Sequence, residues 1–368
     1  MGPFEHYMYV LECGDGSLYT GYAVDVARRV AQHVSGRGAK YTRTHEPVRI
    51  VAQARFYTKR RAMRAEALFK RLSRSEKLRL LMLAADGPFE DVLARELPGL
   101  GEPDACEFVA REFAAHAEPE FAEFQARLLP TVARSRIVGV RTPELRRIAK
   151  ALIARADAAV FLRALPHALF EEMQVNAFAL GLLRPRSAAE ARQVLRRYDR
   201  FLGYVDNWAT CDQLPVAPLA AYPDLALAAA RAWLESERAF AVRYGIGVLM
   251  RLFLGERFAP EHLELVARVG FGAAGASVGG GFACAGAAEG AADVLAPRPA
   301  TDAYYVNMMR AWYFAEALAR QPRYAWTYVE PGVLDEWTRR RTIQKGLESR
   351  KLSLSAKARL RELRDARA

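Results

Sequence analysis

The stretch YMYVLECGDGSLYTGYAVDVARRVAQHV, residues 7–34, decides the fold of the N-terminal part of the chain. Two short runs rich in apolar and aromatic residues, 6–12 and 18–23, flank the turn sequence GDGS, and this pattern predicts a β-hairpin. The run that follows, residues 25–35, has helical spacing and starts with Asp25 in the position of an N-cap. The sequence therefore predicts a hairpin that leads directly into a helix.

The residues after the hairpin and its helix extend this unit and then change in character. We expect a third strand over 48–56 and two basic helices over 59–71 and 74–84, which completes a small α+β domain over residues 1–84. Residues 85–103 are rich in proline and glycine, a composition typical of a linker.

The remaining residues, 104–368, have the periodicity of amphipathic helices. Long runs rich in Ala, Leu and Arg follow one another between short loops, which indicates an all-α, HEAT-like helical-repeat solenoid. Residues 270–298 interrupt this pattern with a Gly/Ala-rich insertion. Helices are expected again over 302–320 and 335–366. The predicted fold class is a two-domain chain, a small α+β domain followed by a helical solenoid.

Basic charge is concentrated in the first domain. Residues 1–82 contain 16 Lys and Arg against 7 Asp and Glu, whereas the rest of the chain contains 38 against 35. An excess of positive charge on a small domain favours a polyanionic partner such as nucleic acid. A general surplus of arginine that keeps the protein in solution would give the same total.

The cysteines and the apolar runs indicate the surroundings in which the chain works. The four cysteines are widely scattered and form no CxxC pair: Cys13, Cys106, Cys211 and Cys284. This spacing argues against a zinc knuckle and a disulfide framework and suits a reducing cytoplasm. No run of about 20 apolar residues is free of charge, so we expect no membrane span.

A first group of candidate site residues lies in the α+β domain: Tyr9, Tyr19, Arg29, His33 and Glu66. The hairpin would bring the tyrosines together, and Arg29 and His33 are four apart on one helix face. Phosphodiester hydrolysis needs a metal, a cation for the developing charge and a group that acts on water. Glu66 can bind Mg²⁺, Arg29 can bind phosphate, and Tyr or His can position the water. On spacing alone, the tyrosines could equally be a packing pair and Glu66 a solvated partner of a basic residue.

These residues stand in a motif that resembles the GIY-YIG nuclease superfamily, in particular its small single-domain bacterial branch. YMY stands at the GIY position and YTG at the YIG position, in a match that runs from about Tyr7 to Leu81. Arg29, His33 and Glu66 match the family's catalytic arginine, helix histidine and metal-binding glutamate. The resemblance implies hydrolysis with a single Mg²⁺ or Mn²⁺ and a motif tyrosine that activates water. In this chain Tyr7 replaces the first Gly of GIY.

Two further residues of this domain are expected at its DNA-binding surface. Gly21 matches the motif glycine, where a side chain could crowd the catalytic surface. Lys40 is a candidate contact to the DNA backbone.

A second group of candidates lies in the helical part. The run YVDNWATCD places Trp208 and Asp212 at i and i+4, hence on one helix face. A carboxylate beside an aromatic wall can stabilise the cationic sugar that forms as an N-glycosidic bond breaks. Arg243 could hold a DNA phosphate, and Trp312 could form a second wall. The alternative is that the tryptophans belong to the core and that Asp212 pairs with a neighbouring arginine.

The segments around these residues resemble the DNA alkylation repair family of HEAT-like repeat proteins, the AlkD-like glycosylases. The match covers about residues 120–364. Carried over from that family, Trp208, Asp212 and Trp312 line a DNA-facing cleft, and Arg243 contacts phosphate. The resemblance implies excision of cationic alkylpurines such as 3-methyladenine or 7-methylguanine, with no cofactor in this domain.

Two other segments of the helical part contain polar candidates. The family's basic segment corresponds to RRTIQKGLES, in which Arg341 and Lys345 are expected to bind DNA although the family's asparagine is missing. His167, Glu171 and Glu172 form a polar group that we interpret as structural hydrogen-bonding residues.

The leading hypothesis is a DNA repair enzyme that acts on alkylated or damaged duplex DNA in the cytoplasm. The solenoid would release the base, and the N-terminal domain would cut the strand nearby with Mg²⁺. In an alternative hypothesis, the solenoid is a non-catalytic reader of DNA structure that targets the nuclease. In a third, the nuclease acts on RNA and the solenoid binds a protein.

Overall fold

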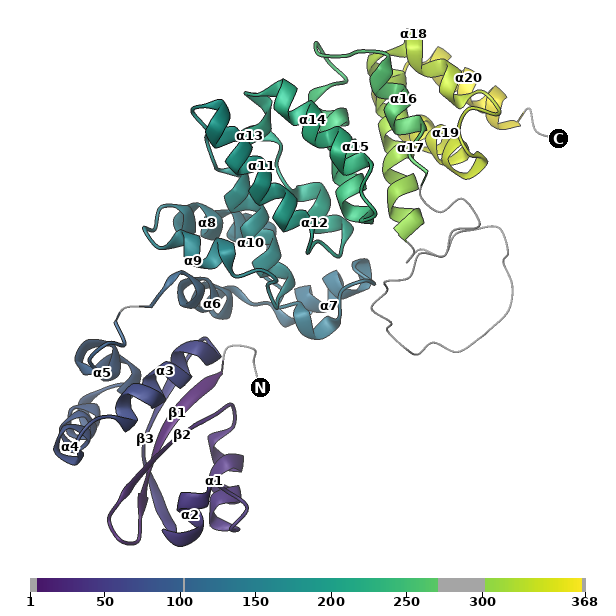
Figure 1. Cartoon of the computed structure of the whole chain (residues 1–368). Helices are drawn as coiled ribbons and strands as arrows, with labels where there is room; N and C mark the ends of the chain where they lie inside the picture. The colour runs from purple at the N-terminus through teal and green to yellow at the C-terminus, as the bar shows by residue number, and fades with distance from the viewer. Residues whose placement is uncertain (1–4, 102, 271–301, 366–368) are drawn as a thin grey trace. The chain divides into compact units, whose positions relative to one another are not determined.

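The computed structural model describes residues 5–101, 103–270 and 302–365 (Figure 1). The chain divides into two compact units. The first is Met1–Phe121 with Val138–Ala164, and the second is Ala122–Ile137 with Leu165–Ala368. The first unit therefore contains the α+β domain together with the first helices of the helical part. Within the described residues, no helix is long and apolar enough to cross a membrane.

The N-terminal domain is built on a three-stranded antiparallel sheet with the strand order β2-β1-β3. Its strands are β1 (His6–Cys13), β2 (Leu18–Ala23) and β3 (Pro47–Phe56). In the hairpin, Tyr9 lies opposite Gly21, and Leu11 lies opposite Tyr19. The predicted hairpin and the predicted third strand are both confirmed.

Short helices surround this sheet. They are α1 (Val26–Val34), α2 (Lys40–Thr44), α3 (Lys59–Lys70), α4 (Arg74–Leu83), the 3-10 helix η1 (Ala84–Asp86) and α5 (Phe89–Glu96). Asp25 caps α1 as predicted, because its side chain accepts from the backbone N–H of Arg28. Three of these elements, α2, η1 and α5, were not predicted.

The alternation of side chains along β1 gives the sheet two buried faces. Met8 and Val10 pack in an apolar cluster with α3, α4 and α5. Tyr9 and Leu11 pack in a second cluster with Ala23 and with α1. The motif residues on β1 and α1 therefore share one face of the sheet, and α3 covers the other.

The segment 85–103 differs from the expected linker. The helix α5 lies within it, and its residues Phe89, Val92 and Leu93 are buried in the core together with α3 and α4. These three residues stand at i, i+3 and i+4, which is the stripe of an amphipathic helix. The prediction was wrong here because proline and glycine are concentrated at the two ends of the helix, whereas its centre is apolar.

The rest of the described chain is helical (Figure 1). Its elements are α6 (Ala105–His116), α7 (Pro119–Leu128), η2 (Arg134–Arg136), α8 (Thr142–Ile153), α9 (Ala158–Arg163), α10 (Phe170–Gly181), α11 (Ala188–Leu202), α12 (Trp208–Gln213), α13 (Ala217–Ala220), α14 (Pro223–Leu234), α15 (Ala239–Leu252), α16 (Glu261–Ala267), α17 (Asp302–Arg320), α18 (Pro322–Ala325), η3 (Trp326–Val329), α19 (Glu336–Glu348) and α20 (Leu354–Asp365). In the second unit α15 packs against α14 and α17, and α17 packs against α19. This succession of packed helices agrees with the predicted all-α part.

Two details of the helical part differ from expectation or lie outside the described residues. The helix expected over 335–366 is two helices, α19 and α20, separated by residues 349–353. The Gly/Ala-rich insertion expected over 270–298 lies outside the described residues from 271 onward.

Candidate functional site

A buried hydrogen-bonded chain connects β1 to α1 and α2. The hydroxyl oxygen of Tyr9 lies 2.9 Å from Nε2 of His33, and Nδ1 of the same ring lies 2.6 Å from the hydroxyl oxygen of Thr42. Thr42 donates its own proton to the carbonyl of Ala39 at 3.0 Å. The backbone N–H of Ala39 points at Nδ1 from 3.3 Å, but the hydroxyl proton of Thr42 is used on the carbonyl of Ala39, so the Thr42 oxygen, only 2.6 Å away, accepts from Nδ1. We therefore assign the ring proton to Nδ1, which leaves Nε2 free to accept from Tyr9.

Two glycines make room for this chain. A Cβ atom at Gly21 would lie 2.4 Å from the Tyr9 hydroxyl oxygen, and one at Gly38 would lie 2.3 Å from Nδ1 of His33. Both distances are far shorter than any van der Waals contact. Gly21 is buried against Tyr9, so a side chain at this position would displace Tyr9. Sequence reasoning missed Gly38 and Thr42, although the run GRGAKYT that contains them follows the helix histidine directly.

Aromatic rings extend from this chain to the surface of the domain. The ring of Tyr19 meets His33 edge-on with centroids 4.9 Å apart and lies 6.3 Å from Tyr9. Tyr41 stacks on Tyr19 at 6.1 Å, and His45 stacks on Tyr41 at 4.2 Å. Tyr9 is fully buried whereas Tyr19 is partly exposed. Of the two motif tyrosines, Tyr19 is therefore the one that a substrate can touch.

Arg29 belongs to this cluster, and Lys40 lies at its margin. Arg29 is partly buried, and its guanidinium donates to the side chain of Gln32 at 3.0 Å. Its charge acts on both Tyr9 and His33. Lys40 is exposed at the first position of α2. The structure therefore keeps the motif arginine beside the buried pair and leaves the lysine open to solvent.

Burial and charge determine how Tyr9 and His33 titrate. Burial raises the pKa of Tyr9 above its ordinary value of 10.0, Tyr19 raises it further, and the Arg29 guanidinium opposes this shift. Burial lowers the pKa of His33 below 6.5, and the charge of Arg29 lowers it further. Both groups are therefore neutral at neutral pH, and the Tyr9 hydroxyl donates to His33.

We predict that the hydrolysis implied by the resemblance has an acidic limb below pH 6.5. As the pH falls, protonation of Nε2 of His33 removes the acceptor of the Tyr9 hydroxyl. The pKa of His33 is lower in the folded chain than in the unfolded chain, so the unfolded chain binds protons first, and stability is also lost as the pH falls below 6.5. Rates measured against pH test this prediction. The limb should disappear in His33→Gln and persist in His116→Gln, and a limb above pH 6.5 in the unmodified protein would contradict it.

Glu66 lies outside this cluster. It belongs to α3, which packs against β1 and β2 from the face opposite to α1. Its side chain is 17% exposed, and its carboxylate lies 2.6 Å from Nζ of Lys70. The described residues contain no group of three or more His, Cys, Asp or Glu side chains that could hold a metal ion. A single carboxylate still suits Mg²⁺, which takes most of its ligands from water and phosphate, so Glu66 fits this metal together with a bound phosphate.

In the second unit, Asp212 and Arg243 form a bidentate ion pair. Nε and Nη2 of Arg243 lie 2.8 and 2.6 Å from the two carboxylate oxygens, and Nη1 donates to the carbonyl of Tyr305 at 2.6 Å. The Arg243 side chain is 6% exposed and that of Asp212 is 17% exposed. The guanidinium is therefore directed at protein groups and is not free for a DNA phosphate. The alternative that Asp212 pairs with a neighbouring arginine describes the structure correctly.

The two tryptophans of the second group have different surroundings. Trp208 is partly buried at the start of α12, and its indole N–H donates to the carbonyl of Leu128 at 3.1 Å. Trp312 is 39% exposed on α17. Together with Lys345 and Glu316 it lines a small cavity of about 190 Å³. Trp312 and Lys345, one of the two expected DNA-binding residues of α19, therefore line the same cavity.

Four candidates of the helical part remain: Arg341, His167, Glu171 and Glu172. Arg341 is partly exposed on α19. Nε2 of the buried His167 lies 2.8 Å from the side-chain nitrogen of Asn176, and Glu171 is completely buried. Glu172 accepts from a backbone N–H at the start of α10 at 2.9 Å. These contacts are those of groups that hold the helices in place, in line with the interpretation of this polar group as structural.

Comparison with known proteins assigns both parts of the chain. The family model described as "GIY-YIG catalytic domain" matches residues 5–79, and the model described as "DNA alkylation repair enzyme" matches residues 109–268. The first 80 or so residues are also similar to a set of curated bacterial proteins. "UPF0213 protein BH0048" of Halalkalibacterium halodurans is 54% identical over 86 residues, which are 23% of this chain and 90% of that protein.

Two further comparisons concern the same part of the chain. "UPF0213 protein SAG0778" of Streptococcus agalactiae is 58% identical over 72 residues, which are 20% of this chain and 82% of that protein. The solution NMR structure of the UPF0213 protein BH0048 from Bacillus halodurans is 50% identical, covers 25% of this chain and 97% of its own, and has a TM-score of 0.17.

The sheet, the buried Tyr9–His33 pair and the matched motif define a GIY-YIG nuclease domain. The chain belongs to the UPF0213 family through this domain and contains a DNA alkylation repair domain in the same polypeptide. This combination is that of a DNA repair protein. It implies DNA binding, and the nuclease domain indicates an endonuclease of a class that generally depends on divalent metals.

Proposed function

We propose that this chain cuts and repairs alkylated duplex DNA with two linked activities. The GIY-YIG domain hydrolyses a phosphodiester bond, and the helical domain binds the lesion and excises cationic alkylated bases such as 3-methyladenine and 7-methylguanine. The observation that best supports this proposal is the presence of both domains in one chain. Two domains that act on DNA and are joined in one polypeptide are most simply used on the same substrate.

In the nuclease domain, each residue of the cluster has a distinct task. Arg29 supplies the positive charge that binds the phosphate and stabilises the charge that develops on it. Tyr19, which is partly exposed, positions the attacking water. The buried rings of Tyr9 and His33 pack against the ring of Tyr19 and fix its orientation. Mg²⁺ or Mn²⁺, when bound, polarises the phosphate, and Glu66 is the residue that would hold it.

The direct test is incubation of the full chain with a duplex that contains 7-methylguanine, with and without Mg²⁺. We expect free base in both conditions and strand cleavage only with Mg²⁺. The samples are analysed without heat or alkali, so that an abasic product is not cut during handling, and the same duplex without protein gives the background of spontaneous base loss. The proposal fails if the protein binds the duplex but produces neither free base nor a strand break.

A second candidate function is favoured by the ion pair in the helical domain. The charge of Asp212 is already balanced by Arg243, so this carboxylate is a weaker stabiliser of a cationic sugar than a free one. In this candidate function the helical domain recognises DNA structure without chemistry and delivers the nuclease to it.

Asp212→Asn separates the two functions. If the helical domain is a glycosylase, base release should fall by about a hundredfold or more while DNA binding is kept. If it is a reader, no base release exists to be lost, and the variant changes affinity at most. Loss of one partner of a buried ion pair costs about 3–5 kcal/mol, so the thermal unfolding of the variant must be measured alongside. Asp199→Asn, at an exposed carboxylate on α11 that accepts from the indole N–H of Trp233 at 3.4 Å, is the control for an Asp→Asn change outside the candidate site.

A further inference from the structure

A carboxylate of α6, a helix later in the chain, accepts hydrogen bonds from the residues at the N-terminus of α3. Glu107 of α6 is only 3% exposed, and its two carboxylate oxygens accept from the backbone N–H of Tyr57 at 2.8 Å and from the hydroxyl of Thr58 at 2.6 Å. Thr58 is itself the N-cap of α3, because its hydroxyl oxygen accepts from the backbone N–H of Arg61. Glu107, which is not part of α3, therefore fixes the side chain of the N-cap residue of that helix.

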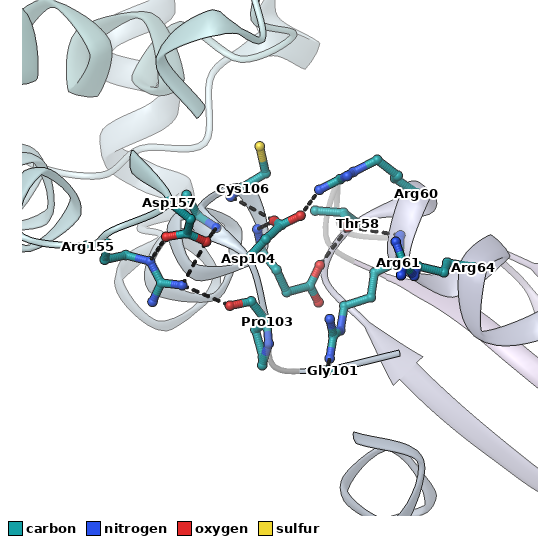
Figure 2. A network of polar contacts seen from close by, with 12 residues as sticks. Thr58, Arg60, Arg61, Arg64, Gly101, Pro103, Asp104, Cys106, Arg155 and Asp157 are labelled. Carbon is teal, nitrogen blue, oxygen red and sulfur yellow. Dashed lines mark hydrogen bonds and ion pairs between the residues drawn. The ribbon is translucent and has the colours of Figure 1, made fainter. Parts of the chain in front are cut away.

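The sequence of α3 explains why an external carboxylate stabilises it. Its first turn contains Lys59, Arg60 and Arg61 and no acidic residue. Positive side chains are unfavourable beside the positive end of a helix dipole, and negative groups are favourable there. Asp104, the N-cap of α6, forms an ion pair with Arg60 (Figure 2). Glu107 and Asp104 thus bring to this end of α3 the negative charge that its own sequence lacks.

The chain between the two helices is held at the same place. Arg61 donates to the carbonyl of Gly101 at 2.6 Å, and Arg64 donates to that of Gly99 at 2.6 Å. Both glycines have a positive φ, 82° at Gly99 and 64° at Gly101, a conformation that other residues adopt only with strain. The connection between α3 and α6 is therefore tied down by side chains of α3.

The beginning of α6 is also tied to the next helices of the first unit. Arg155 donates to the carbonyl of Pro103 at 2.9 Å (Figure 2). Asp157 accepts from the backbone N–H of Ala105 at 2.9 Å. Arg155 and Asp157 are paired with each other at 2.8 Å. The helix that carries Glu107 is therefore anchored on both sides, to the nuclease domain and to the corner between α8 and α9.

We propose that Glu107 is a positioning residue of the nuclease, which holds α3, and with it Glu66, in the place that catalysis requires. Glu66 lies eight residues after Thr58 on the same rigid helix, about 12 Å along its axis. A tilt at the capped end therefore moves Glu66 relative to Arg29 and Tyr19 on the other face of the sheet. The inference rests on the proposed nuclease function and makes the first helices of the helical part a component of the nuclease.

The test compares Glu107→Gln with Glu112→Gln in the full chain. Glu112 is on the same helix, but its carboxylate pairs with Arg147 and does not touch α3. We expect Glu107→Gln to lower kcat for Mg²⁺-dependent cleavage about tenfold, to leave KM for DNA nearly unchanged, and to raise the Mg²⁺ concentration needed for half-maximal rate. Hydrogen exchange at the amides of Tyr57 and Arg61 should become about tenfold faster. Glu112→Gln should change none of these quantities.

Thr58→Val gives an independent test if the first variant folds poorly. It removes the hydroxyl that donates to Glu107 and keeps the shape of the side chain, so it should lower kcat in the same way. The two variants share the loss of the hydrogen bond between Thr58 and Glu107, whereas Thr58→Val also removes the acceptor of the Arg61 N–H and Glu107→Gln also weakens the bond from the Tyr57 N–H. The double variant should therefore lose less than the product of the two single losses. Additive losses, or a loss of kcat that simply follows a loss of folded protein, would overturn the proposal.

The remaining outcomes separate this inference from the proposed function. Faster exchange at Tyr57 with an unchanged kcat overturns the positioning role. Unchanged exchange overturns the proposed coupling of Glu107 to α3. If the unmodified chain cleaves no DNA, the proposed function fails and the positioning role fails with it, while faster exchange in Glu107→Gln would still show that α6 holds the end of α3.

Discussion

Replacement of Glu66 by alanine is expected to lower Mg²⁺-dependent strand cleavage by about a thousandfold and to leave base release by the helical domain unchanged. Glu66 is the carboxylate assigned to the metal, and its neighbour Lys70 supplies no oxygen ligand in its place. The side chain is partly exposed on α3, so its removal leaves no buried cavity and should not unfold the domain. Nicking of a duplex at several Mg²⁺ concentrations, with base release measured on the same samples, gives both quantities.

Glu96→Gln is the matched control for this variant. Glu96 is a carboxylate of α5 that pairs with Arg79 at 3.0 Å, in the same domain but on another helix. The Glu96→Gln variant should cleave DNA at the rate of the unmodified protein. Cleavage by Glu66→Ala at that rate would show that the metal is held elsewhere, and loss of both activities together would contradict the division of labour between the two domains.

Replacement of Gly21 by alanine is expected to lower cleavage by about a hundredfold and stability by about 1–3 kcal/mol. The added Cβ would lie 2.4 Å from the hydroxyl oxygen of Tyr9 and 2.5 Å from its Cζ. Tyr9 is completely buried and cannot move away without disturbing His33. The rate of cleavage and the thermal unfolding temperature measure the two effects.

Gly87→Ala is the control for the loss of a glycine as such. Gly87 has an extended backbone, with φ of 177°, and a Cβ there would meet no atom within 4 Å. This variant should keep both rate and stability. If Gly21→Ala behaves in the same way, the close approach of Gly21 to Tyr9 has no part in the reaction.

Elements defined by neighbouring residues were predicted well. The hairpin, the cap at Asp25 and the helix over 302–320 depend on alternation, turn residues and helical spacing, all of which are local. The helix α5 was missed because it is short and its ends have the composition of a linker. Its existence depends on the burial of Phe89, Val92 and Leu93 against α3 and α4, and burial is not a local property.

In the candidate sites, too, contacts that depend on tertiary packing could not be predicted from local sequence patterns. Recognition of the motif picked out Tyr9, Tyr19, Arg29 and His33, and the structure places them in one cluster. Their supporting partners, Thr42 and Gly38, come from a loop and a short helix whose position depends on how they pack. In the helical domain, the ion pair between Asp212 and Arg243 depends on the packing of α12 against α15, which the sequence does not specify.

The family of each part could be recognised from the sequence, because motifs and periodicity are properties of residues close together in the chain. Which charged side chains meet could be seen only once the helices were packed. Asp212 and Arg243 are 31 residues apart, and Thr58 and Glu107 are 49 apart. Pairs at such separations form only when helices pack in a particular way, and no local pattern specifies that packing. The connection between the nuclease and the first helices of the repair domain is for this reason a finding of the structure.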